Sequence, residues 1–139
     1  MPFVDLTRPL AALRAEVDEA VRRVLDSGIY ILGPEVSAFE SELAAFLGAG
    51  FAVGVANGTE AIAIALMACG IGPGDEVITT DLTAFPTVTG ICMSGAVPVT
   101  ADIDAESGLL DPVDVEAKIT AATKALVCLL YTSPSPRDS

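Results

Sequence analysis

The sequence predicts an α/β protein built on a mostly parallel β-sheet. Short apolar segments rich in β-branched residues alternate along the chain with segments of helical periodicity, and Gly and Pro separate them. The composition is 52% hydrophobic with a mean hydropathy of +0.60, which suits strands that are buried on both faces. The alternating order βαβαβαβ predicts right-handed crossovers between parallel strands.

Two helices are expected before the first strand. Apolar residues at positions 10, 13, 17, 21, 24 and 25 predict a helix over 10–25, with Thr7 as its cap. The run Asp26-Ser27-Gly28 ends this helix. A second helix begins after Gly33 with Pro34 in its first turn, and Gly48 ends it.

The rest of the chain alternates strands and helices. Strands are expected at Phe51–Val55, Glu76–Thr80, Val97–Ala101 and Lys124–Val127, and helices at 59–69, 87–94 and 111–119, with Asp81–Pro86 as a loop. The glycines of Gly70–Gly74 do not form a dinucleotide-binding fingerprint, because that fingerprint needs a strand before it and a helix after it. Here the order is reversed, so these glycines end one helix and lead into a strand.

The run Asn57-Gly58-Thr59-Glu60 joins the first expected strand to the helix that follows it. Such a turn directs free backbone N–H groups and the helix dipole at one point, which suits a phosphate, and the Thr59 hydroxyl adds a donor. The alternative is purely structural, with Asn57 as an N-cap and Gly58 as a turn residue.

Charge and composition disfavour several classes of protein. The net charge is −12 and the pI is near 4.1, so nucleic acid and anionic membranes are poor partners. No apolar run reaches the roughly 18 residues of a membrane span. The cysteines, Cys69, Cys92 and Cys128, are widely spaced, and the N-terminal residues lack the pattern of a secretory signal, so reduced thiols in the cytoplasm are expected. Without His or a close Cys pair, no metal site is predicted.

Several motifs together resemble one enzyme family. The turn Asn57–Ala61 is similar to the Ser-Gly-Thr-x-Ala turn of the DegT/StrS sugar aminotransferases. Further motifs continue the resemblance in the same order and spacing over residues 3–127: Ser27–Val36, Gly70–Ile78, Gly95–Val99, Asp102–Asp104 and Thr123–Val127. Each motif is weak alone, whereas the ordered set is specific.

The resemblance implies the N-terminal part of the large domain of the aspartate aminotransferase (type I) fold, a truncated three-layer αβα structure. In that fold, strands encoded after Val127 lie between the Phe51–Val55 strand and the next three. The cofactor implied is pyridoxal 5′-phosphate (PLP), with Gly58, Thr59 and Glu60 at its phosphate. Ala84 stands where relatives place an aromatic residue on the cofactor ring; Phe85 either takes over that stacking or belongs to the core. Tyr30 and Ile31 are expected at the substrate site or at its dimer-related copy, although their loop also suits a plain helix–helix connection.

The function implied for the parent protein is transfer of an amino group to a nucleotide-linked keto sugar, with glutamate as the donor and a homodimer as the assembly. Neither Lys118 nor Lys124 matches the family's Schiff-base lysine, which lies beyond Val127, so no catalytic residue is expected here and the fragment is expected to be inactive. Three alternatives stay open: a sugar dehydratase of the same family, a non-catalytic regulatory protein of this fold, and an unrelated phosphate-binding domain.

The last twelve residues differ from the family pattern. Residues 1–127 are expected to form the aminotransferase part, whereas Cys128–Ser139 resembles the translation of a transposon-type sequencing adapter. Leu129 and Leu130 are apolar and in phase with the fourth strand, which they could extend. Asp102 and Asp104 are one residue apart on an extended chain, so they are expected to cap or to face solvent rather than to form an acid–base pair.

Overall fold

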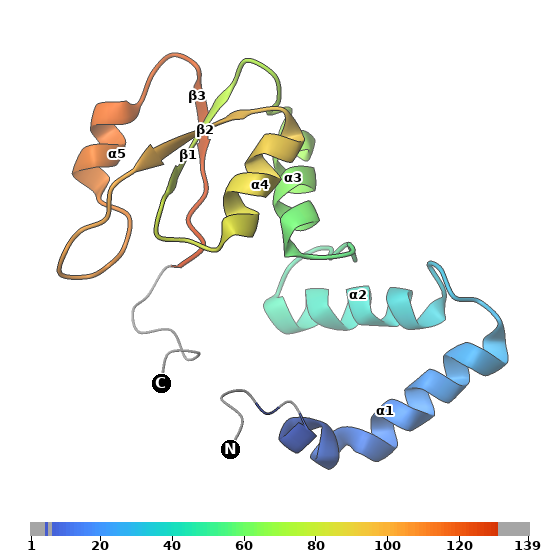
Figure 1. The fold of residues 1–139 in the computed structure, drawn as a ribbon. Helices are drawn as coiled ribbons and strands as arrows, with labels where there is room; N and C mark the ends of the chain where they lie inside the picture. The colour runs from blue at the N-terminus through green and yellow to red at the C-terminus, as the bar shows by residue number, and fades with distance from the viewer. Residues whose placement is uncertain (1–4, 6, 131–139) are drawn as a thin grey trace. The chain divides into compact units, whose positions relative to one another are not determined.

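The computed structural model describes residue 5 and residues 7–130, which fall into two compact units (Figure 1). The first unit covers residues 1–54 and the second covers residues 55–139. Residues 131–139, most of the expected adapter-derived segment, lie outside the described part of the chain.

The first unit contains two helices, α1 (Thr7–Ser27) and α2 (Pro34–Leu47), close to the predicted ranges. The predicted cap was wrong in detail. Thr7 lies within α1, and the Asp5 carboxylate accepts a hydrogen bond from the Thr7 N–H at 3.0 Å. The helix ends as predicted, because Gly28 adopts a left-handed φ of 66° that other residues take only with strain.

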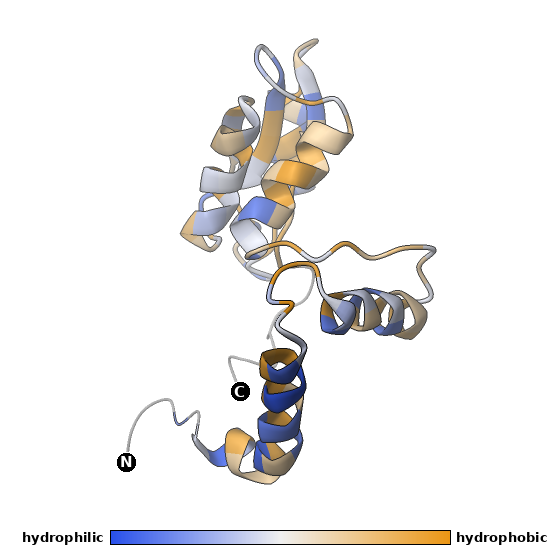
Figure 2. Ribbon diagram, turned by 90° about the vertical axis from the view of Figure 1, so that its right-hand side faces the viewer, coloured by the Kyte–Doolittle hydropathy of each residue, from blue (hydrophilic) through white to orange (hydrophobic). Residues whose placement is uncertain are grey.

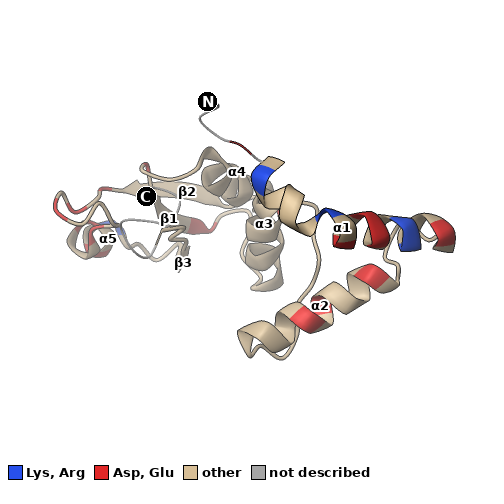
Figure 3. Cartoon of the chain, turned by 90° about the horizontal axis from the view of Figure 1, so that it is seen from below, with Lys and Arg blue, Asp and Glu red and all other residues tan. Residues whose placement is uncertain are grey.

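A bidentate ion pair joins the end of α1 to the start of α2. Arg23 donates to the Glu35 carboxylate at 2.8 and 3.2 Å. This hydrogen bonding, followed by the charge of Arg23, holds the pKa of Glu35 below its ordinary value. Figure 3 shows that α1 carries charges of both signs, whereas α2 carries only acidic ones.

The expected strand at Phe51–Val55 is not formed, which corrects the sequence-based prediction. Phe51 is 92% exposed, and no described strand pairs with this segment. A strand exists only through hydrogen bonds to a neighbour, however favourable its residues are. Here the Gly54 N–H donates instead to a carboxylate oxygen of Glu40 on α2, at 2.7 Å.

The second unit contains α3 (Gly58–Ala68), β1 (Glu76–Thr80), α4 (Phe85–Ser94), β2 (Val97–Ala101), α5 (Pro112–Lys118) and β3 (Thr123–Leu126). The three strands form a parallel sheet in the order β2-β1-β3. Ile78 of β1 lies opposite Val99 of β2 and Leu126 of β3. The prediction of a parallel α/β sheet is therefore confirmed.

The sheet of the second unit is covered by helices on both faces (Figure 1). The crossovers β1-α4-β2 and β2-α5-β3 run in opposite directions along the sheet, so right-handed connections place α4 and α5 on opposite faces. The core lies on the α3 and α4 side and is built around Leu66, Val77, Ile91 and Ala96. Figure 2 shows this concentration of apolar residues in the strands and in α3 and α4.

The two outer strands of this sheet differ in whether the backbone groups at their open edges are occupied. On β2, Pro98 has no N–H to offer, and the Thr100 carbonyl accepts from Lys118 of α5 at 2.7 Å. Strand β3 pairs only with β1 among the described residues and ends at Leu126. Leu129 and Leu130, which could have extended this strand, lie outside it, and the outer edge of β3 is unpaired among the described residues.

Candidate functional site

The turn that begins α3 leaves two backbone donors free. The Asn57 side chain caps the helix by accepting the Glu60 N–H at 3.0 Å, and the Asn57 carbonyl accepts the Ala61 N–H at 3.0 Å. The N–H groups of Gly58 and Thr59 make no hydrogen bond to the described residues. Asn57 is thus an N-cap, as the structural alternative proposed. The cap uses the Glu60 N–H and leaves those of Gly58 and Thr59 available.

Space around the turn is open on the side of Gly58. A Cβ placed on Gly58 would meet nothing within 4 Å, so a ligand can approach the backbone closely. Glu60, in the first turn of α3, is half-buried, as is Thr59. Two free N–H groups at the positive end of a helix dipole, next to the Thr59 hydroxyl, are a donor set that suits an anion.

Helix α4 supports this turn from behind. A Cβ on Gly90 would lie 2.8 Å from the Thr59 carbonyl oxygen and 2.9 Å from the Ile62 Cβ. The two helices therefore approach more closely at Gly90 than any side chain would allow. Sequence reasoning missed Gly90, although an isolated glycine within a helical pattern is itself a signal of close packing.

The loop Asp81–Ala84 joins β1 to α4 at the carboxyl end of the strand. The Leu82 N–H donates to the Thr80 hydroxyl at 3.2 Å, and the Thr83 and Thr87 hydroxyls are 3.0 Å apart. Phe85 opens α4 and is 81% exposed. Phe85 is therefore outside the core of the second unit, and its ring is exposed there.

The turn of α3 and the loop before α4 belong to the same edge of the second unit. The unit alternates helices with parallel strands, so the helices run opposite to the strands and begin where the strands end. Figure 1 shows α3 and α4 beginning at the end of β1. In open parallel sheets, ligands bind at this carboxyl edge.

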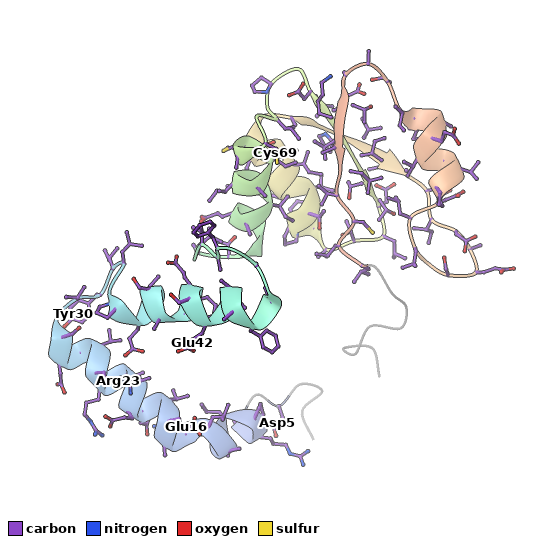
Figure 4. All side chains as sticks on the ribbon, turned by 180° about the vertical axis from the view of Figure 1, so that it is seen from behind. Asp5, Glu16, Arg23, Tyr30, Glu42 and Cys69 are labelled. Carbon is purple, nitrogen blue, oxygen red and sulfur yellow. The ribbon has the colours of Figure 1, made fainter. Side chains whose placement is uncertain are left out.

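The loop between α1 and α2 exposes its apolar residues. Tyr30 is 66% exposed and Ile31 is 83% exposed, and Leu32 has a φ of 49°. Figure 4 shows Tyr30 just beyond the end of α1, close to the last turns of that helix, which carry Arg23. A left-handed φ at a leucine is unusual, and strained backbone of this kind clusters at functional sites. Tyr30 and Ile31 belong to the first unit, whereas the α3 turn belongs to the second.

Both lysines have structural partners. Lys118 donates to the Thr100 carbonyl at 2.7 Å and pairs with Asp114 at 2.9 Å, and Lys124 donates to the Ala121 carbonyl at 2.9 Å. The pKa of Asp114 lies below its ordinary value, first because it accepts the Asp102 N–H and then because of Lys118. These contacts hold α5 against the end of β2.

Asp102 and Asp104 do not form a carboxylate pair. Asp102 accepts the N–H of its neighbour Ile103 at 2.8 Å. Asp104 accepts the N–H and hydroxyl of Ser107 at 2.8 and 2.7 Å, which lowers the pKa of Asp104. Both side chains thus serve local turns, in agreement with the sequence-based interpretation.

Two negative observations apply to the described residues. No group of three or more His, Cys, Asp or Glu side chains there is arranged to hold a metal ion. No described helix is both long enough and apolar enough to cross a membrane.

Comparison with known proteins places these features in a family. The chain is 46% identical over 125 residues to the UDP-2-acetamido-2-deoxy-3-oxo-D-glucuronate aminotransferase of Pseudomonas aeruginosa, covering 90% of this chain and 35% of that protein. It is similar to the crystal structure of DesV from S. venezuelae in complex with a ketimine intermediate. The TM-score is 0.89 at 45% identity, over 99% of this chain and 37% of that one.

A third similarity is to NtdA from Bacillus subtilis with bound cofactor PMP, with a TM-score of 0.84 at 31% identity, over 91% of this chain and 29% of that one. The chain thus spans only about a third of the length of these relatives. The sequence profile of one family matches residues 11–131. This chain belongs to the DegT/DnrJ/EryC1/StrS aminotransferase family.

Proposed function

We propose that this chain is the N-terminal part of a PLP-dependent aminotransferase that acts on a nucleotide-linked keto sugar. In this proposal the amino donor is glutamate, the complete enzyme is a cytoplasmic homodimer, and its product is an amino sugar. The family membership supports the reaction class. The observation that carries the proposal is the α3 turn, whose free donors lie at the carboxyl edge of a parallel sheet.

The residues of the second unit fit the cofactor. The phosphate would be held by the N–H groups of Gly58 and Thr59 and by the Thr59 hydroxyl. The Glu60 N–H, which was expected to join them, already donates to the Asn57 side chain. The exposed ring of Phe85 suits stacking on the pyridine ring. When bound, the cofactor supplies an electron sink for amino transfer. These residues bind and orient it, and the lysine that attaches it would lie beyond residue 127.

Tyr30 and Ile31 are proposed to contact the substrate, in the same subunit or in the partner subunit of the dimer. Their exposure and the unusual backbone of Leu32 support a loop built for contact rather than for a plain connection. Residues 128–139 are proposed to derive from a sequencing adapter. The nucleotide sequence of the uninterrupted gene beyond position 127 tests this and would also show whether the deciding residue is the lysine of an aminotransferase or the histidine of a dehydratase.

The phosphate assignment is tested by Thr59→Val in the full-length protein. Loss of one charge-assisted hydrogen bond of roughly 1.5–3 kcal/mol should weaken PLP binding about 10- to 150-fold. Thr59→Ser is the matched control, because it keeps the hydroxyl and should keep the affinity. If Thr59→Val binds PLP as tightly as the unaltered protein, Thr59 has only a structural role in the turn.

A further inference from the structure

The loop Asp81–Ala84, which leads directly into the proposed ring-stacking residue Phe85, has few side-chain anchors. Helix α4 begins with Ala84 as its N-cap, which has no side chain to bond the helix end. Within the described chain, the single side-chain hydrogen bond from Asp81–Ala84 to α4 is the one between the Thr83 and Thr87 hydroxyls, at 3.0 Å. The Thr87 N–H also donates to the Ala84 carbonyl, at 2.9 Å.

The two threonines differ sharply in environment. Thr87 is 0% exposed and lies on the buried side of α4, whereas Thr83 is half-buried in the loop. A buried hydroxyl must find a partner or lose free energy, and Thr83 is the partner of Thr87. The bond therefore ties the loop to a fixed point in the core, one turn before the close contact at Gly90.

We propose that Thr83 and Thr87 are positioning residues that hold the Asp81–Ala84 loop against α4 and thereby orient Phe85 toward the cofactor ring. The inference rests on the proposed function. Neither threonine touches the cofactor in this proposal, and both act through the loop. Their loss should affect the ring side of the site while leaving the phosphate side, at Gly58 and Thr59, intact.

The test uses isosteric threonine-to-valine substitutions in the full-length protein. Thr83→Val and Thr87→Val remove the hydroxyl pair, and each should weaken PLP binding about tenfold, the size expected for one buried neutral hydrogen bond. The inhibition constant of inorganic phosphate against PLP binding, which probes the phosphate side alone, should stay unchanged. Thr83→Ser should restore the affinity for PLP.

Thr79→Val is the matched control. Thr79 is also 0% exposed and lies on β1 in the same unit, but its hydroxyl has no partner among the described residues. Its replacement should leave PLP affinity unchanged. The proposal is overturned if Thr83→Val leaves PLP affinity unchanged, if it weakens PLP and phosphate equally, or if Thr79→Val has the same effect.

A second readout needs no cofactor. In the cofactor-free protein, amide hydrogen exchange of residues 82–87 should speed up in Thr83→Val and should not speed up in Thr79→Val. Unchanged exchange in Thr83→Val would show that the hydroxyl pair does not hold the loop. Because this measurement does not involve PLP, it separates failure of the positioning pair from failure of the proposed function, which Thr59→Val tests.

Discussion

Replacing Thr79 by valine should stabilise the second unit. The Thr79 side chain is 0% exposed, and its hydroxyl has no hydrogen-bond partner among the described residues. Burying a hydroxyl without a partner costs about 1–3 kcal/mol. Valine has nearly the same shape, places a methyl group in that position and suits a strand well. The expected gain in the free energy of unfolding is about 1–2 kcal/mol.

Thr87→Val provides the opposite case at an equally buried position. Its hydroxyl has a partner in Thr83, so the same chemical change removes a hydrogen bond and should cost about 1 kcal/mol. Both variants can be compared by urea unfolding followed by far-UV circular dichroism, at several protein concentrations so that association is detected. Destabilisation of Thr79→Val by as much as Thr87→Val would refute the argument, because it would mean that the Thr79 hydroxyl has a partner such as a bound water.

Three further predictions concern packing, pH and association. Gly90→Val should lower the free energy of unfolding by about 1–3 kcal/mol, because the valine side chain would overlap the Thr59 carbonyl. A melting curve like that of the unaltered protein would contradict this loss of stability. The same variant should also weaken phosphate binding. The Arg23–Glu35 pair contributes stability above the ordinary pKa of Glu35, about 4.5, and loses it as the pH falls through the lowered folded-state value. Helix content in the first unit should therefore decrease in acid, and Glu35→Gln should weaken this decrease, which can be followed by circular dichroism. An unchanged acid transition in this variant would assign the decrease to other carboxylates such as Asp5, whose pKa is also lowered. Residues 1–139 alone should sediment above the 14.2 kDa monomer, because the edge of β3 and the apolar residues of α1 and α2 are uncovered. They should show neither a PLP–lysine absorption band nor transaminase activity, because Lys118 and Lys124 both donate hydrogen bonds to backbone carbonyls. A cooperatively melting monomer that binds PLP as an imine would contradict this last prediction.

Local signals predicted most of the elements. The strands Glu76–Thr80 and Val97–Ala101 were predicted with the bounds that they have in the structure, because β-branched residues between glycine turns leave few alternatives. Asn57 as a cap and Gly28 as a helix end were also readable, since both depend on the residue's own conformational preference. The α3 turn could be located from the sequence for the same reason.

The features that depend on neighbours could not be predicted from local sequence. Phe51–Val55 has the composition of a strand, yet it forms none without a partner strand, and its Gly54 N–H bonds to Glu40 instead. The exposure of Phe85, the contact of Gly90 with Thr59 and the unpartnered hydroxyl of Thr79 arise only when α3, α4 and β1 are packed together. Sequence determines the conformations that each segment prefers, because those preferences are local. Tertiary structure decides which groups find a partner, because a hydrogen bond or a close contact requires two segments that are far apart along the chain.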